Sequence, residues 1–146
     1  MNEELIYSEK SKLPLKIWIF VAGMSVSIYL AIWAPLGVAP AAIMTLLFFV
    51  GFVSVLKKMQ TRVAISKDYL YANNAKIEVK FIKKVTPLDK AAYRQLNGVS
   101  ADPAAFLATN FWSNTGVKIE INDKNDPTPY WLISTKRPNE IAEKLN

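Results

Sequence analysis

The chain has 146 residues, no cysteine, no histidine and a formal net charge of +6. The missing thiols and imidazoles exclude disulfides, thiolate or imidazole catalysis and the common zinc sites, so we expect no catalytic residue, no cofactor and no metal. Charge is unevenly distributed, because no Asp, Glu, Lys or Arg lies between Ile17 and Leu56. Charges before Ile17 balance, so the positive surplus lies after Leu56.

Residues 1–14 are predicted to form a cytoplasmic arm, and residues 15–56 a transmembrane hairpin. About 20 apolar residues in a helix cross a hydrocarbon core of ~30 Å. Two prolines and a glycine within Ala34–Pro40 disfavour helix, so a turn is expected there. The two spans then cover about 15–34 and 40–56, with Pro40 suited to the first turn of its helix.

Basic residues flank both predicted spans on one side, whereas the hairpin loop carries no charge. By the positive-inside rule, we expect a multi-pass protein of the cell membrane with both termini in the cytoplasm. No ionisable side chain lies within the spans, which argues against a transport pathway. The flanking residues are Lys10, Lys12, Lys16, Lys57, Lys58 and Arg62.

A cleaved signal peptide is the alternative interpretation of the first span. Lys16 would close its positively charged region, and Val38–Ala41 would be a poor cleavage site. The secreted product would then begin with the apolar stretch Ile43–Val50, which needs immediate burial. Two spans are the simpler account.

Small residues form a candidate packing face on the first span. Gly23, Ser27 and Ala31 recur every four residues, so they share one helix face that another helix can approach closely. The first interpretation is packing within the hairpin, against small residues of the second span. The alternative is the seam of a homodimer.

Residues 57–146 are predicted to form a cytoplasmic domain of the α+β class. Alternating apolar and polar residues predict strands at 61–66, 69–72, 76–81, 82–88, 117–122 and 130–135, the last of them central. Helices are expected at 89–98 and 138–145, with a single helical turn at 104–107 in the irregular segment 99–116 and a turn over 123–129. Mostly antiparallel strands with a C-terminal helix describe a small barrel or bent sheet, as in the pleckstrin-homology-like fold.

Three segments carry a resemblance: Tyr7–Glu9 with Leu13–Pro14 and Trp18, then Ala101–Leu107, and most specifically Asp126–Pro138. The chain resembles a family of small actinobacterial integral membrane proteins of unknown function. The resemblance implies two spans, a cytoplasmic domain and no established activity. It leaves open the role of the motif positions Tyr7, Glu9, Pro14, Asp102, Pro103, Asp126, Pro127, Pro129, Tyr130, Trp131, Arg137 and Pro138.

The first functional hypothesis is a membrane-anchored binding or scaffolding module at the cytoplasmic face, with membrane lipid or a protein as its partner. A Lys or Arg near an anionic surface contributes roughly 1 kcal/mol to membrane binding. The alternative is that the basic residues near the membrane and in the domain only set the membrane topology and form a solvent-exposed face. The candidate lipid contacts are Lys57, Lys58, Arg62, Lys83 and Lys84.

An accessory subunit of a larger membrane complex is the second hypothesis. It would use the Gly23, Ser27 and Ala31 face together with Tyr130–Trp131, although the aromatic pair also suits a core. An enzyme acting on a membrane-bound substrate would depend on Asp102, Asp123 or Asp126, two of which precede proline and suit turns, so no enzyme is expected. Nucleic-acid binding has only the net charge behind it and is not expected.

Overall fold

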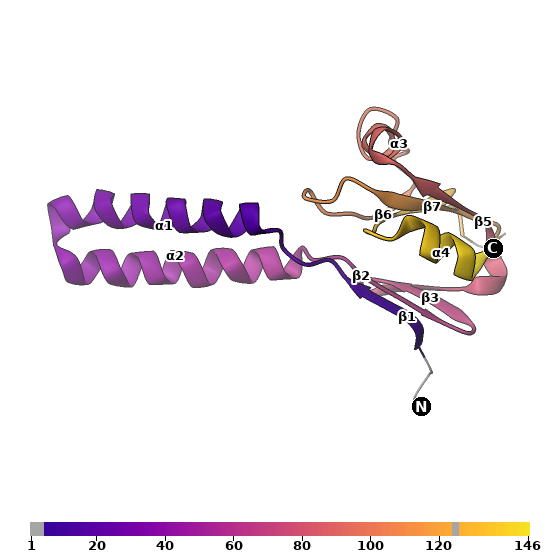
Figure 1. The fold of residues 1–146 in the computed structure, drawn as a ribbon, viewed down its shortest axis with the longest axis horizontal. Coiled ribbons are helices and arrows are strands. Elements are labelled where there is room, and N and C mark those ends of the chain that lie inside the picture. The colour runs from indigo at the N-terminus through magenta and orange to yellow at the C-terminus, as the bar shows by residue number, and fades with distance from the viewer. Residues whose placement is uncertain (1–4, 124–125) are drawn as a thin grey trace. The chain divides into compact units, whose positions relative to one another are not determined.

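The computed structural model describes residues 5–123 and 126–146, which form two compact units. One unit is a helical hairpin spanning Lys12–Gln60. The other is a domain that combines the chain before Lys12 with the chain after Gln60. The hairpin is therefore inserted between the first two strands of the domain (Figure 1).

The hairpin consists of α1 (Leu15–Leu36) and α2 (Val38–Lys58). Both helices are long and apolar enough to cross a membrane, which confirms the two predicted apolar helices in length and composition. The turn between them is shorter than predicted, because only Gly37 separates the helices. Its φ of 84° lies in the left-handed region that favours glycine.

Pro35 lies inside α1, whereas the sequence predicts a turn that begins at Ala34. Proline in the last turn removes a single backbone hydrogen bond, and the helix still closes because Gly37 N donates to Trp33 O at 2.9 Å. Pro40 lies in the first turn of α2, as predicted. Both prolines are therefore accommodated within the helices and not in the turn.

The buried residues of the hairpin are not the predicted small ones. Val21 and Leu56 are buried there with Ala41, and the rings of Phe48 and Phe52 stack at 5.4 Å within α2. Gly23, Ser27 and Ala31 are instead exposed, so the structure does not use them for packing within the hairpin.

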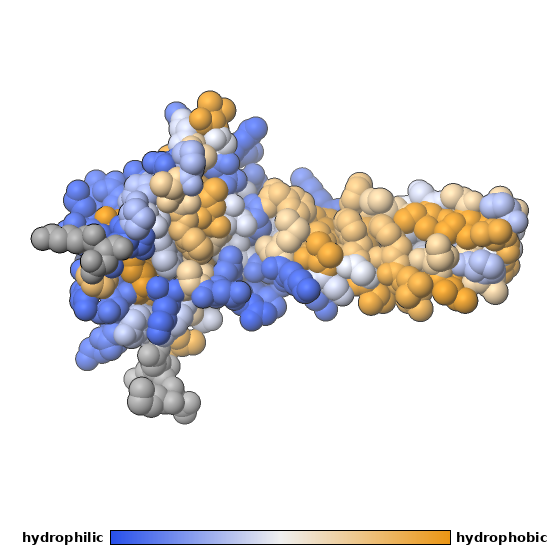
Figure 2. All heavy atoms as spheres, turned by 180° about the vertical axis from the view of Figure 1, so that it is seen from behind, coloured by the Kyte–Doolittle hydropathy of each residue, from blue (hydrophilic) through white to orange (hydrophobic). Residues whose placement is uncertain are grey.

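The outer surface of the hairpin is hydrophobic, whereas most of the domain's visible surface is hydrophilic (Figure 2). Three serines in the helices bond internally, whereas the buried hydroxyl of Thr45 has no hydrogen-bond partner among the described residues. Ser25, Ser27 and Ser54 each donate to the carbonyl oxygen four residues earlier. Such bonds satisfy a polar side chain without water.

The domain contains two four-stranded sheets. The first is antiparallel throughout and has the order β1-β2-β3-β4, formed by Leu5–Lys10, Arg62–Ser66, Tyr69–Ala72 and Ala75–Glu78. The second has the order β5-β7-β8-β6, formed by Ile82–Leu88, Gly116–Ile121, Tyr130–Ser134 and Phe106–Ala108. Only the β6–β8 pair is parallel among the described strands. The predicted mostly antiparallel sheet structure is confirmed.

Both sheets contribute to one hydrophobic core, which α4 (Pro138–Leu145) completes. Buried side chains come from β1 to β4, from β5 to β8 and from Ile141 of α4. Every residue of β8 is buried, as its predicted central position requires. The core includes Tyr7 of β1, so residues 5–10 belong to the domain and not to a separate arm.

Two local predictions differ from the structure. The predicted helical turn at 104–107 is replaced by the short strand β6, in which Leu107 pairs with Leu132. Alanine favours helix locally, but pairing with the buried β8 outweighs that preference. The predicted strand 76–81 ends at Glu78 and continues as the 3-10 turn Val79–Phe81, where Val79 N donates to Asp68 O.

The helix predicted at 89–98 is confirmed as α3 (Lys90–Leu96). Asp89 caps it by accepting a hydrogen bond from Ala92 N at 2.9 Å. The C-terminal helix is also confirmed. Part of the predicted turn over 123–129 lies outside the described residues.

Candidate functional site

The domain has two ends with different chemistry. At the hairpin end, Ser11 N donates to Thr61 O at 2.8 Å, so the residues on either side of the hairpin lie together. We call the opposite end of the domain the far end. The strand register places it where Leu5 pairs with Ser66 and Ile82 pairs with Ile121.

A network of uncharged polar side chains, the junction network, holds the hairpin end together. Asn110 donates through Nδ2 to Ser11 Oγ at 3.2 Å and to Thr61 Oγ1 at 3.0 Å. Trp112 Nε1 donates to Ser11 Oγ at 2.9 Å. Asn110, Ser11 and Thr61 are all buried. The network therefore fixes both chain crossings to the loop between β6 and β7.

The junction network continues into the second sheet. Asn110 N donates to Ser134 Oγ at 3.1 Å, and Tyr93 OH lies 2.6 Å from the same oxygen. Burial raises the pKa of Tyr93, against the lowering effect of the bond to Ser134. The phenol stays neutral and serves as a structural hydrogen-bonding group.

A second contact, the Glu9 clasp, joins β1 to the segment between β8 and α4. Glu9 Oε2 accepts from Tyr7 OH at 2.7 Å and from Thr135 Oγ1 at 2.5 Å, and Oε1 accepts from Lys136 N at 3.1 Å. The Arg137 guanidinium lies 5.4 Å from the centre of the Tyr7 ring. The clasp thus brings Arg137 to the motif positions Tyr7 and Glu9, which lie far from it in sequence.

The clasp shifts two pKa values in opposite directions. Burial acts to raise the pKa of Glu9, but the bonds from Thr135, Tyr7 and Lys136 outweigh it and leave the pKa below its usual value. Burial, together with the neighbouring Glu9, raises the pKa of Tyr7. Glu9 is therefore ionised and Tyr7 neutral at pH 7.

A basic groove lies on the outer face of the first sheet at the hairpin end. Its cavity of about 510 Å³ is lined by Ser8, Glu9, Lys10, Arg62, Val63, Ala64, Tyr71 and Asn73. Lys10 and Arg62 are exposed and directly opposite each other across β1 and β2. Like charges at such a position oppose pairing, so a bound anion would relieve their repulsion.

Within the domain, the predicted basic contacts do not form one cluster. Arg62 borders the basic groove, whereas Lys83 and Lys84 lie exposed on β5 of the other sheet. Along β5 they are about four residues, or ~13 Å, from Leu88 and the hairpin end. Lys57 and Lys58 end α2 and are exposed. Lys10, which was not among the predicted lipid contacts, borders the basic groove together with Arg62.

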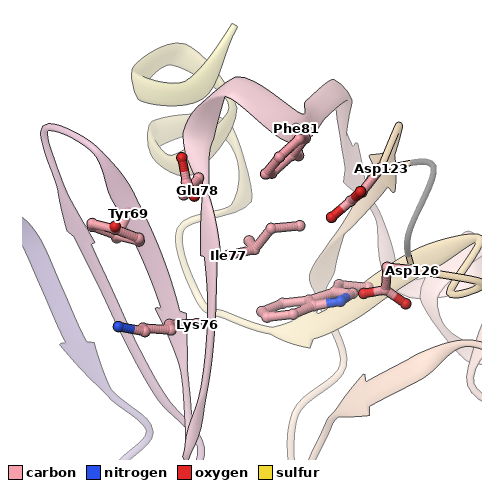
Figure 3. Close-up of a pocket in the computed structure, with 8 residues that line it drawn as sticks. Tyr69, Lys76, Ile77, Glu78, Phe81, Asp123 and Asp126 are labelled. Carbon is pink, nitrogen blue, oxygen red and sulfur yellow. The ribbon is translucent and has the colours of Figure 1, made fainter.

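The far end carries a pocket of about 290 Å³ with aromatic walls and three carboxylates (Figure 3). Asp123 and Asp126 lie across the pocket from Tyr69 and Lys76 (Figure 3). The lining consists of Tyr69, Lys76, Ile77, Glu78, Phe81, Asp123, Asp126 and Trp131. Carboxylates and aromatic faces together suit a cationic group.

The carboxylates named for an enzyme lie in two places, because Asp123 and Asp126 line the far pocket and Asp102 does not. Asp126 accepts from Thr128 N at 2.9 Å, and the hydrogen bonds from Thr128 lower its pKa. Asp102 lies elsewhere, where it accepts from Ala104 N and donates through its own N to Tyr130 OH. Both aspartates stabilise turns, as their positions before Pro127 and Pro103 indicate.

The remaining motif positions lie at the starts of helices, in the interior of the domain or just before β8. Pro14 precedes the first residue of α1, and Pro138 begins α4 after Arg137, which forms an ion pair with Glu140 at 3.1 Å. Tyr130 and Trp131 are buried in the domain, and Trp131 also lines the far pocket. Pro127 and Pro129 lead into β8.

Sequence reasoning missed Ser11, Thr61 and Asn110. Each is an isolated polar residue outside a strand or helix, and polar residues there are ordinary. The only signal was the aromatic pair Phe111–Trp112 in a polar loop.

Residues 6–145 match the family described as protein of unknown function (DUF3093). No curated protein matches the chain. No solved structure matches it. The family match spans both the hairpin and the domain.

Proposed function

We propose that this chain, which belongs to the DUF3093 family of unknown function, is a membrane-anchored binding module at the cytoplasmic face of the cell membrane. The observation that carries the proposal is the exposed apolar surface of two helices of 22 and 21 residues. At 1.5 Å per residue these are about 33 and 32 Å long, enough for a bilayer core. In water, so large an apolar surface would cause association.

The insertion point of the hairpin supports an anchor over a cleaved signal peptide. Cleavage at Val38–Ala41 would remove β1, and with it the buried Tyr7 and the Glu9 clasp. Lysines before α1 and at the end of α2 favour both termini in the cytoplasm.

Single-cysteine labelling tests this topology, because the natural chain has no cysteine. Lys67→Cys in the domain and Val38→Cys at the start of α2 would be treated with a membrane-impermeant maleimide in oriented vesicles. We expect Lys67→Cys to react only in inside-out vesicles and Val38→Cys only in right-side-out vesicles. Reaction of both from the same side would contradict the hairpin.

The binding activity that the geometry favours is capture of an anionic lipid headgroup in the basic groove. Lys10 and Arg62 face each other there, next to the point where the chain enters and leaves the hairpin. Two cations near an anionic surface contribute about 2 kcal/mol, or roughly 30-fold in affinity. A free phosphate would be attracted by the same charges.

Titration of the detergent-solubilised full chain with short-chain phosphatidylglycerol tests this binding. Lys10→Gln with Arg62→Gln should weaken it roughly 30-fold. The matched pair Lys83→Gln with Lys84→Gln removes the same charge at the far end and should change it less than threefold. Equal weakening by both pairs would contradict a groove, and inorganic phosphate in place of lipid reports whether glycerol and acyl groups matter.

An accessory subunit of a larger membrane complex is the second candidate, and the far pocket favours it. Its three carboxylates against one lysine give a net negative lining in a basic protein, which suits a cationic side chain of a partner. The exposed face of Gly23, Ser27 and Ala31 offers a second contact, either to that partner or to another copy of this chain. A stoichiometric partner that Glu78→Gln with Asp126→Asn releases would support this candidate.

The pleckstrin-homology-like fold is also our proposal for the domain. Two facing sheets and a C-terminal helix support it. The parallel β6–β8 pair and the hairpin inserted after β1 are departures from a simple antiparallel meander.

A further inference from the structure

The loop between β6 and β7 exposes an aromatic side chain at the hairpin end of the domain. We call Asn110–Asn114 the aromatic loop. Phe111 is 64% exposed, and its ring meets that of Trp112 edge-on, at 4.8 Å between centroids and 83° between planes. An exposed phenylalanine braced by a tryptophan has no role in the core of the domain.

The junction network holds this loop at the chain crossings. Trp112 and Asn110 donate to Ser11, Asn110 also donates to Thr61, and Ser113 N donates to Asn110 Oδ1 at 2.9 Å. Ser11 is the last domain residue before the hairpin, and Thr61 is the first after it. The aromatic loop is therefore bonded to both points where the chain enters and leaves the hairpin.

Chain length limits how far the loop can be from the ends of the apolar helices. Leu15 begins α1 four residues after Ser11, and Lys58 ends α2 three residues before Thr61. An extended chain spans at most ~3.6 Å per residue, which gives about 14 and 11 Å. The headgroup region is roughly 5–7 Å wide on each side of the hydrocarbon core, so these limits keep both chain crossings within about two to three such widths of the core.

We propose that the aromatic loop inserts Phe111 into the headgroup region of the bilayer that the hairpin spans. The inference rests on the proposed anchoring of the hairpin. Aromatic rings concentrate at this depth, and Trp112 keeps its N–H bonded to Ser11 while its ring braces Phe111. Lys12 and Lys57 in the adjoining hairpin segments would meet anionic headgroups beside it.

The hydrogen bonds of Asn110 prepare the loop for this contact. They hold the loop backbone, and the bond from Trp112 to Ser11 holds the indole ring, before any lipid is met, so little conformational entropy is lost on insertion. The loop thereby gives the domain a third attachment, in addition to the two chain crossings, and restricts its rotation about them. Val99 provides the contrast, because it is fully exposed but no described hydrogen bond ties its loop to Ser11 or Thr61.

Spin labels on single cysteines in the full chain, reconstituted in phosphatidylglycerol-containing nanodiscs, test the inference. Asn114→Cys reports on the loop and keeps both aromatic rings, Lys67→Cys is the aqueous reference, and Leu46→Cys reports on the hairpin. We expect the ratio of oxygen to nickel-chelate accessibility at residue 114 to exceed that at residue 67 severalfold. Adding Phe111→Ser should abolish the excess, whereas adding Val99→Ser should leave it unchanged.

The three positions separate failure of this inference from failure of the anchor. A lipid-exposed label at residue 46 with an aqueous label at residue 114 overturns the insertion of the loop and leaves the anchor in place. An aqueous label at residue 46 overturns the anchor itself. An excess at residue 114 that survives Phe111→Ser overturns the role of Phe111.

Discussion

The two ends of the domain differ in how their polar groups are used. At the hairpin end, Asn110 and Glu9 bond inward to residues from distant parts of the chain. At the far end, Glu78 forms a surface ion pair with Lys80, and Asp126 bonds to the nearby Thr128. The hairpin end is therefore built for rigidity, and the far end keeps charge facing an open pocket.

This difference shows which end of the domain holds the two chain crossings together. Backbone pairing alone would leave the crossings at Ser11 and Thr61 joined by the neighbouring β1–β2 ladder. The junction network and the Glu9 clasp add bonds to the second sheet. Substitutions at the hairpin end should therefore cost more stability than comparable ones at the far end.

Gly116→Ala should have the largest effect. Gly116 pairs with Leu88 and Ser134 near the hairpin end, and an added Cβ would lie 2.5 Å from Ile133 O and 2.7 Å from the Tyr93 ring. We expect a loss of about 3 kcal/mol in the free energy of unfolding, because strand backbone cannot yield as a side chain can.

Thermal and denaturant unfolding of the full chain in detergent would measure this loss. Gly51→Ala is the control, since its added Cβ meets no atom within 4 Å. A Gly116→Ala protein as stable as the control would show that the hairpin end is more adaptable than the packing implies.

Asn110→Ala should have the next largest effect. It leaves Thr61 and Ser113 N without their Asn110 partner, and buried polar groups left unpaired cost about 2 kcal/mol in total. Unfolding of the full chain would show the loss, and Asn74→Ala in the β3–β4 turn is a control of the same type. Equal stability of the two variants would mean that the junction network does not cross-link the crossings.

Glu9→Gln should have the smallest effect at pH 7, a loss of about 1 kcal/mol in the free energy of unfolding. It should also change the pH dependence of that free energy. The pKa of Glu9 is lowered in the folded protein from a reference value of 4.5. Its contribution to stability is therefore fully present above that value and is lost as pH falls below it towards the folded-state pKa. Glu9→Gln should flatten the acid limb of the stability curve.

Unfolding midpoints measured between pH 7 and about pH 3 would test this. Glu78→Gln is the matched control at the far end, where the carboxylate forms an exposed ion pair worth less than about 1 kcal/mol. The distinction between the two ends would be wrong if the stability of Glu9→Gln fell with acid as steeply as that of the unsubstituted chain. It would also be wrong if Glu78→Gln flattened the curve equally.

The elements predicted most closely from the sequence are those set by local chemistry. The charge-free stretch predicts two apolar helices, and Asp89 predicts the start of α3. Alternation predicts β5 and β7 within a residue or two. Each depends on neighbours within a few positions along the chain, which a single sequence displays.

The missed features depend on pairing between distant segments. β1 becomes a strand because β2, beyond the whole hairpin, supplies its partner. β6 forms because it pairs in parallel with β8, although the alanine-rich sequence around it favours a helix. Asn110 donates a hydrogen bond to Ser11, almost a hundred residues earlier in the chain, and no local sequence pattern predicts this contact. The candidate site was therefore less predictable than the fold.

Insertion of the hairpin between β1 and β2 sets the order of events during synthesis. β1 leaves the ribosome first, but its partner follows only after both apolar helices have been made. Pairing of α1 with α2 then brings the two strands together and replaces the closure of a loop of about 50 residues by that of a short one. Completion of the domain would therefore report that the helices have paired, and a chain with a failed hairpin would keep an open sheet edge for proteases and chaperones to recognise.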